Sequence, residues 1–171
     1  MTTWTRHLYE HDPLAIAKGE SNYLSVRNIF GYQENVTTSF IPAWEYATAY
    51  TYPNSAVTMA VASTDAANDN GYTVRIIGLD ANYNIISEDV IIPATTTKAF
   101  FRINDVIYFN TDGNQGLITV SNGGTVYAAI RIGDGRNQAS IYTVPAGHCF
   151  YLYRIDAFSN DSTSSKTGVF K

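Results

Sequence analysis

The chain has 171 residues, a net charge of −4 and a single cysteine, which excludes an intrachain disulfide. Its length suffices to bury a core without disulfides or metals, and its 11 basic residues are scattered singly, so the sequence predicts no nucleic-acid partner. Charged residues make up only 15% of the chain, while 13 tyrosines and many Thr, Asn and Ser provide a composition suited to contact with other protein surfaces.

Residues 1–20 are interpreted as a short N-terminal arm. It carries the apolar side chains of Trp4, Leu8 and Tyr9, which we expect to become ordered when the arm packs on a partner. Residues 1–6 lack the apolar core of a secretion signal, and no window approaches the roughly 20 apolar residues of a membrane span. We therefore expect a protein made in the cytoplasm, with no membrane partner.

The arm also contains the spelling His7-Leu-Tyr-Glu-His11, which matches the H-x-x-E-H signature of certain zinc proteases. Asp12-Pro13 follows directly and disfavours the helix that such a site needs. We interpret the match as coincidental and predict no metal, no cofactor, no catalytic residue and no enzyme activity. A metallohydrolase that uses His7, Glu10 and His11 is the alternative, and it would bind zinc.

A row of aromatic residues follows between residues 40 and 53. Its members Trp44, Tyr46, Tyr50 and Tyr52 all occupy even positions, which would lie on one face of a strand. Such a row usually belongs to a core, but buried tyrosine hydroxyls need hydrogen-bond partners, so a contact surface is a competing interpretation. We predict these four residues, with those of the arm, as partner-binding residues.

From residue 21 to residue 158, short β-branched and aromatic runs alternate with turn residues, which predicts antiparallel strands. The best-marked hairpin pairs residues 72–79 with 85–92 around the Asx-rich turn at 80–84. A turn is expected at 67–71, and further strands at 56–64, 98–103, 106–109, 117–121, 125–132, 140–144 and 148–158. The pattern predicts an all-β domain over 21–158, an antiparallel β-sandwich of jelly-roll-like form.

The last residues, 159–171, contain a Ser- and Thr-rich tract with too few apolar side chains to offset the entropy of ordering. We expect this segment to be a flexible or irregular C-terminal tail. Three parts are thus predicted: the arm, the β domain and the tail.

Several segments, in this order and spacing, make residues 21–158 resemble a family of virion proteins of tailed bacteriophages. They are YPNSAVTM at 52–59, GLDANYN at 78–84 followed by ISE at 86–88, FRIN at 101–104, and IYTVPAG at 141–147 leading into Tyr151-Leu152. The resemblance implies a capsid decoration (cement) protein, a jelly-roll or β-sandwich homotrimer seated on the outside of the head where capsomers meet. The Ser- and Thr-rich tract departs from the family's pattern.

A cement protein needs no chemistry, because it only has to hold neighbouring capsomers together against the pressure of the packaged genome. Three linked copies would gain an avidity of about 10²–10⁴ over one copy. We therefore expect a structural protein on the outer capsid surface of the virion, with the major capsid protein as partner. The competing interpretation is a tail or host-surface module in which the aromatic row stacks on glycan rings.

Overall fold

A computed structural model describes residues 16, 18, 24–33, 42–46 and 49–157 of the chain. The predicted arm, apart from residues 16 and 18, and the predicted tail lie outside these residues. The described part contains seven strands and one short helix: β1 (Ala60–Ser63), α3 (Ala66–Asp69), β2 (Thr73–Leu79), β3 (Ile85–Ile91), β4 (Ala94–Thr95), β5 (Arg102–Phe109), β6 (Ile118–Asn122) and β7 (Thr125–Ile130). In this part, no helix has the length and apolar character needed to cross a membrane.

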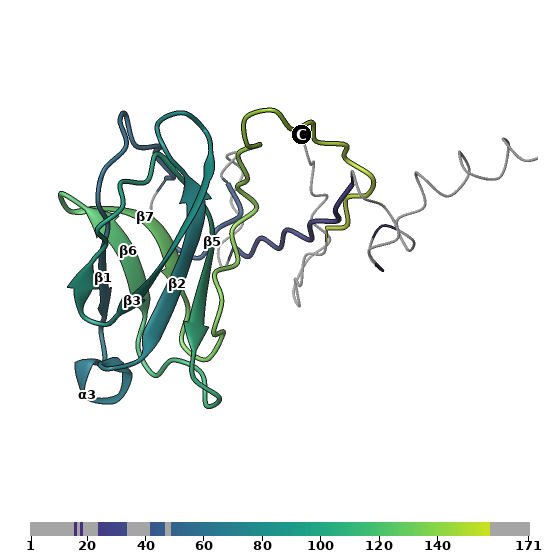
Figure 1. Cartoon of the computed structure of the whole chain (residues 1–171). Coiled ribbons are helices and arrows are strands. Elements are labelled where there is room, and N and C mark those ends of the chain that lie inside the picture. Colours follow the sequence, from purple (N-terminus) through teal and green to yellow (C-terminus); the bar gives the residue numbers. More distant parts are fainter. Residues whose placement is uncertain (1–15, 17, 19–23, 34–41, 47–48, 158–171) are drawn as a thin grey trace, which may run out of the picture.

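The strands form two antiparallel sheets, one of order β4-β1-β6-β7 and one of order β3-β2-β5. Figure 1 shows the sheets facing each other, with α3 at one end. The prediction of a mostly β fold built from antiparallel sheets is confirmed, and the arrangement is consistent with a β-sandwich.

The core lies between the sheets because alternate side chains of each strand point inward. On β2, Val74 and Ile76 are buried, whereas Arg75 between them is exposed and pairs with Asp89 of β3 at 2.7 Å. The facing sheet contributes the apolar side chains of Val61, Ile118, Val120 and Ile130 to the same cluster, and Met59, just before β1, belongs to it as well. Burial of these side chains is the main stabilising contribution to the fold.

The predicted β2–β3 hairpin is confirmed. Its turn is held by Asp80, whose Oδ1 accepts hydrogen bonds from the backbone N–H groups of Asn82 at 2.8 Å and Asn84 at 2.9 Å. On the other side of β2, the register with β5 shifts between Ile77 and Gly78. A Cβ at Gly78 would lie 2.1 Å from the carbonyl oxygen of Arg102, so glycine is required where these two backbones approach.

Other sequence-based assignments are corrected by the structure. The strand predicted at 106–109 is part of a longer strand, β5, which includes only the last two residues of the run predicted at 98–103, and the turn predicted at 67–71 includes the end of α3. Residues 140–144 and 148–157, predicted as strands, form none. At Thr143, the side-chain amide of Asn104 takes the place of a neighbouring strand: it donates a hydrogen bond to the Thr143 carbonyl at 2.8 Å and accepts one from the Thr143 N–H at 2.9 Å.

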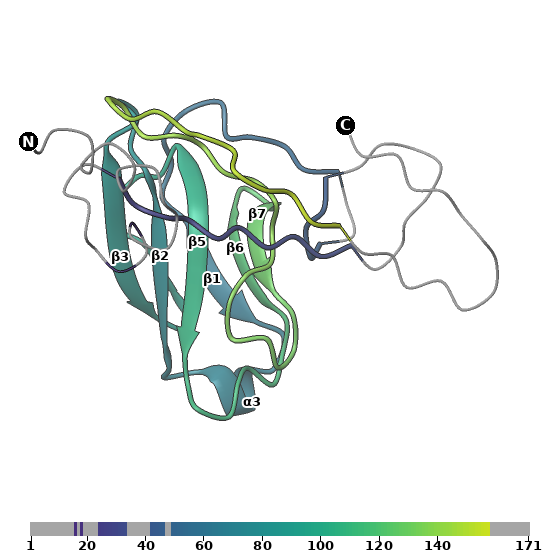
Figure 2. The ribbon, with the colours of Figure 1, turned by 90° about the vertical axis from the view of Figure 1, so that its right-hand side faces the viewer.

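The segments 24–33 and 138–157 form an additional layer beside the sandwich. Figure 1 shows them extending from one side of it, and Figure 2 shows both passing in front of the β3-β2-β5 sheet. The two segments are joined to each other by the hydrogen bond from the Tyr32 N–H to the Gln138 carbonyl at 3.1 Å, and segment 138–157 is joined to the β2–β3 turn by the hydrogen bond from the Ala146 N–H to the Tyr83 carbonyl at 2.9 Å.

The fully buried carboxylate of Asp69 links both sheets at the end that carries α3. It accepts hydrogen bonds from the Ser63 hydroxyl, from the Tyr108 hydroxyl at 3.1 Å, and from the backbone N–H groups of Gln115 at 2.9 Å and Gly116 at 2.8 Å. Burial raises the pKa of this carboxyl, but the hydrogen bonds together outweigh burial and lower the pKa below its usual value. Asp69 is therefore ionised at neutral pH.

Replacement of Asp69 by Asn should lower the free energy of unfolding by about 2–3 kcal/mol, because an amide nitrogen cannot accept the hydrogen bonds that one carboxylate oxygen now receives. Urea denaturation followed by circular dichroism measures the change. Asp112→Asn is the matched control, since Asp112 is exposed in a nearby loop. Equal stability of the two variants would contradict the structural role assigned to Asp69.

Candidate functional site

The predicted aromatic row forms one cluster of rings, although its described backbone is irregular and not a strand. The ring centroids of Trp44 and Tyr46 are 5.5 Å apart, those of Trp44 and Tyr50 are 5.0 Å apart, and those of Tyr50 and Tyr52 are 4.9 Å apart. The last two pairs meet edge to face, a favoured geometry for aromatic side chains. The structure thus brings together the four residues that the sequence grouped.

The cluster runs from the interior to the surface. Trp44 is 2% exposed, Tyr46 and Tyr50 are half-buried, and Tyr52 is 50% exposed. Burial, with the neighbouring Tyr52 hydroxyl, raises the pKa of Tyr50 to about 12, so its hydroxyl stays neutral. Tyr52 is the member available to a partner, and the others support it. A partner-binding role for the cluster stays a prediction, and Trp4, Leu8 and Tyr9 lie outside the described residues.

The Tyr52 ring is also held from β5. The Arg102 guanidinium lies 4.9 Å from the centroid of this ring and 3.8 Å from that of Phe101, and its Nη1 donates to the Pro53 carbonyl at 3.1 Å. A guanidinium placed over aromatic faces is attracted by their quadrupoles. These contacts fix the orientation of Tyr52 before any partner binds.

Glu45, next to Trp44, is an unusual carboxyl. Its Oε2 accepts a hydrogen bond from the backbone N–H of Arg131 at 3.2 Å, while Oε1 is buried without a hydrogen-bond partner. Burial is the main reason why the pKa of Glu45 is raised to about 7. The hydrogen bond from the Arg131 N–H lowers this pKa, and the negative charge of Asp134 raises it. Close to neutral pH, Glu45 is thus divided between its charged and neutral forms.

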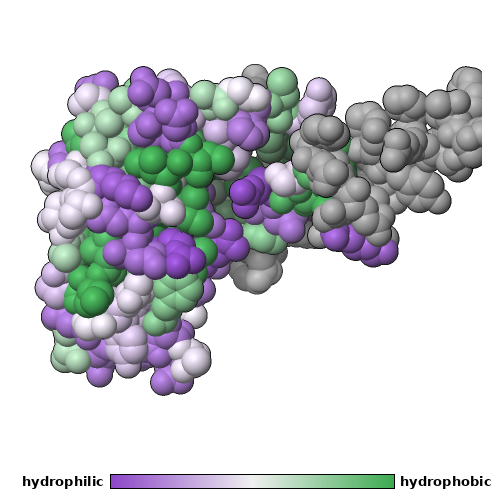
Figure 3. Space-filling model, viewed as in Figure 1, coloured by the Kyte–Doolittle hydropathy of each residue, from purple (hydrophilic) through white to green (hydrophobic). Residues whose placement is uncertain are grey.

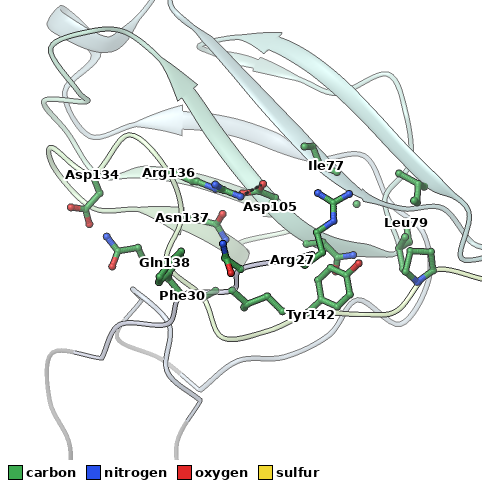
Figure 4. Close-up of a pocket in the computed structure, with 17 residues that line it drawn as sticks. Arg27, Phe30, Ile77, Leu79, Asp105, Asp134, Arg136, Asn137, Gln138 and Tyr142 are labelled. Carbon is green, nitrogen blue, oxygen red and sulfur yellow. Dashed lines mark hydrogen bonds and ion pairs between the residues drawn. The ribbon is translucent and has the colours of Figure 1, made fainter. Parts of the chain in front are cut away.

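A cavity of about 410 Å³ lies on the outer face of the β3-β2-β5 sheet (Figure 4). Three groups of residues line it: segment 27–30, side chains of the sheet, and segment 134–145. Its apolar lining includes Phe30, Ile77, Leu79, Ile85 and Pro145. Its volume falls in the range of about 300–1,000 Å³ that is typical of ligand-binding pockets.

Two arginines and two aspartates, among them Asp134, carry the charges of the cavity lining. Arg136 forms a two-pronged ion pair with Asp105, through Nε at 2.8 Å and Nη2 at 2.6 Å. Arg27 reaches toward Ile77 and Leu79 with Tyr142 beside it, as Figure 4 shows. Among the described residues, Arg27 has no carboxylate partner.

Apolar side chains on the segments beside the sandwich are unusually exposed. In the C-terminal segment, Tyr151 is 80% exposed, Tyr153 79%, Ile155 69% and Leu152 62%; in segment 24–33, Phe30 is 68% exposed. The hydropathy surface in Figure 3 shows apolar patches, in green, on the sandwich and toward these segments. Several large apolar side chains that are exposed within one segment are a feature of interaction sites.

Among the described residues, no three His, Cys, Asp or Glu side chains gather where they could hold a metal ion. His7, Glu10 and His11 of the alternative zinc site lie outside these residues. Compared with protein-family models, with curated proteins and with solved structures, the chain matches none.

The cavity, with Arg27 at its side, is a candidate site that the sequence analysis missed. Arg27, Asn104 and Tyr142 come from three distant parts of the chain, and no local motif joins them. The exposed segment after residue 148 was visible in the sequence as an apolar run, but that run was assigned to a strand.

Substitutions in the aromatic cluster should show which of its rings stabilise the fold and which do not. Trp44→Ala should lower the free energy of unfolding by about 3–5 kcal/mol, because it leaves a large cavity in a buried site. Tyr52→Ala should cost less than about 1 kcal/mol, because its ring is half exposed. Chemical denaturation of both variants measures these values, and a large loss of stability in Tyr52→Ala would show that its ring belongs to the core.

The raised pKa of Glu45 should make stability depend on pH. Because the folded-state pKa, about 7, lies above the unfolded value, the contribution of this group is most favourable below pH 4.5 and declines as the pH rises to 7. Glu45→Gln should remove that decline, so the difference in melting temperature, variant minus wild type, should grow from pH 5 to pH 8. A difference that stays constant over this range would show that Glu45 titrates normally.

Proposed function

We propose that this chain is a structural protein of a bacteriophage virion, a capsid decoration (cement) protein that binds the major capsid protein. It attaches to the outer surface of the head at capsomer junctions, as a homotrimer, and stabilises the shell against the pressure of the genome. We also propose that its two sheets have the jelly-roll form. The role requires no cofactor and no reacting group.

The observation that carries the proposal is the exposed apolar surface on the segments beside the sandwich. Four side chains of the C-terminal segment, those of Tyr151, Leu152, Tyr153 and Ile155, are each more than 60% exposed. Large exposed apolar surfaces on soluble proteins mark interaction sites. The sandwich supplies a rigid base for them, and the resemblance to phage virion proteins supplies the identity of the partner.

The mechanics of attachment follow from these surfaces. A specific protein–protein contact buries about 1,600 Å² of surface in total. The exposed segments, together with the surface at Tyr52, would supply the contact area for two neighbouring capsomers. Aromatic side chains are enriched at the centres of such contacts because they bury a large area at a low cost in side-chain entropy. Contacts to two capsomers at once oppose their separation.

A tail or host-surface module that binds glycans is the second candidate. The half-exposed ring of Tyr52, oriented by Arg102, is the observation that favours it, because sugar rings stack on aromatic faces that are held in place. Both candidates are binding proteins, but they differ in position and copy number on the particle.

The test uses the purified chain and emptied heads of the phage whose genome encodes it. We expect the protein to sediment with the heads, to appear by electron microscopy in many copies on their outer surface, and to raise the temperature at which filled heads release DNA. Binding that is confined to the tail, or affinity for host glycans without affinity for heads, would favour the second candidate instead.

A further inference from the structure

The strand β3 is an outer strand of its sheet, and its free edge has the properties of a template for a further strand. Its only strand partner is β2, and their pairing is unbroken from the pair Thr73–Ile91 to the pair Leu79–Ile85. Figure 2 shows β3 at the margin of the sandwich. A long edge without a bulge readily pairs with a strand of another chain, which causes self-association or aggregation.

The hydrogen bonds at the two ends of the β2–β3 hairpin show which backbone groups face this edge. The Ile92 N–H donates to the Tyr72 carbonyl at 3.0 Å, and the Asp80 N–H donates to the Asn84 carbonyl at 3.0 Å. Even-numbered residues from 84 to 92 therefore direct their backbone groups toward β2, because the direction alternates along a strand. Four residues of β3 direct theirs outward: Ile85, Ser87, Asp89 and Ile91.

The side chains along this edge fit a second copy of the same strand. Ile85 and Ile91 are 55% and 60% exposed. In an antiparallel pairing of two copies about Glu88, Ile85 of one copy would lie opposite Ile91 of the other, and outward backbone groups would meet outward backbone groups. The same pairing would place the two Glu88 residues opposite each other, where like charges are destabilising.

Three residues cover the middle of this edge. The Lys98 ammonium donates to the outward carbonyl of Ser87 at 2.6 Å. The Glu88 carboxylate holds the backbone of Lys98 in place, because it accepts from the N–H groups of Thr97 at 2.7 Å and Lys98 at 2.8 Å. It also accepts from the Thr97 hydroxyl at 3.0 Å. Glu88, Thr97 and Lys98 are here called the edge clasp.

The edge clasp occupies a position that an added strand needs. Such a strand must donate a backbone N–H to the Ser87 carbonyl, to which Lys98 is already bound. It must also displace the Lys98 ammonium or bury it, and burial of an unpaired charge is strongly unfavourable. A lysine at an edge is one of the common means by which proteins prevent strand addition. Lys98 is the only lysine between residues 19 and 165.

The other edge of the same sheet is covered by the chain's own backbone. On β5, the Tyr108 N–H donates to the Gly135 carbonyl at 2.8 Å, and the Val106 carbonyl accepts from the Asn137 N–H at 3.0 Å. Within the part of the chain that the structure describes, Lys98 is the one hydrogen-bond partner of the outward backbone groups of β3. Protection of β3 therefore depends on the clasp.

We propose that the edge clasp is an autoinhibitory contact: it prevents β3 from pairing with β3 of a second copy, and without it two copies join along this edge. The two β3-β2-β5 sheets then form one continuous sheet across a two-fold axis. The proposal concerns contacts between copies in solution and does not depend on the proposed function.

Lys98→Ala in the purified full chain tests the clasp, by sedimentation and light scattering over a wide range of concentrations. It frees the Ser87 carbonyl and removes the ammonium, so association beyond the wild-type oligomer should begin at a concentration at least about tenfold lower than for the wild type. Lys98→Arg is the matched control, because a guanidinium keeps the charge and the hydrogen-bond donors, and it should behave as the wild type. Circular dichroism and thermal unfolding check that each variant is folded.

Ser87→Pro, added to Lys98→Ala, shows whether the new association uses this edge. Proline lacks an N–H, and the N–H of Ser87 faces away from β2, so the β2–β3 pairing is kept while a strand can no longer be added. The double variant should return to the association of the wild type. Ser87→Ala in the same background removes only the hydroxyl and should leave the association of Lys98→Ala unchanged.

Hydrogen exchange gives a measurement that needs no proline. The outward N–H groups of Ser87 and Asp89 should exchange rapidly in the wild type and become protected in the associated form of Lys98→Ala, because they then lie in a backbone ladder.

Three results would overturn the proposal. Lys98→Ala that associates no more than the wild type would show that the clasp is not needed to keep the edge closed. Association that persists in the variant with Ser87→Pro, or that leaves the N–H groups of Ser87 and Asp89 unprotected, would show that the copies meet through another surface. All of these measurements are made without phage heads, so none of them decides between the two candidate functions.

Discussion

The carboxylate of Asp69 fixes the relative position of the two sheets. Ser63 belongs to β1 and the N–H groups of Gln115 and Gly116 lie just before β6, in one sheet, whereas Tyr108 belongs to β5 in the other, and all four donate to Asp69. A buried charge without partners would be strongly destabilising, so these groups must be assembled together for the sandwich to close. The approach is tight enough that a Cβ at Gly116 would lie 2.3 Å from the Asp65 nitrogen.

Among the described residues, the segments beside the sandwich are held in a different way. A few hydrogen bonds, rather than strand ladders, attach them: Asn104 binds both backbone groups of Thr143, the Ala146 N–H donates to the Tyr83 carbonyl at 2.9 Å, and the Tyr32 N–H donates to the Gln138 carbonyl at 3.1 Å. Such attachments set where a segment begins but leave most of its backbone without cross-strand bonds. The molecule therefore combines a base of two hydrogen-bonded sheets with segments that only a few hydrogen bonds hold to it.

Local patterns were sufficient to predict the parts of the fold that depend on neighbouring residues. The β2–β3 hairpin followed from alternation and from the Asx side chains of its turn, because both act over a few residues. The strands expected at 140–144 and 148–158 had the same β-branched and aromatic composition, yet a strand needs an edge to pair with. At 140–144 the amide of Asn104 takes the place of that edge, a contact between residues 39 apart that no local pattern encodes.

The candidate site, too, could be predicted from the sequence only as far as residues close in the chain determine it. The even spacing of Trp44, Tyr46, Tyr50 and Tyr52 identified rings that do meet, but the reason given, a shared strand face, was wrong, since none of these four residues belongs to a strand. Spacing also carries no information on depth, and depth decides that Trp44 supports the cluster while Tyr52 can touch a partner. The same holds for residues 150–155: their apolar character was plain in the sequence, but only the structure shows that they lie outside both sheets, where their side chains are exposed instead of forming a core.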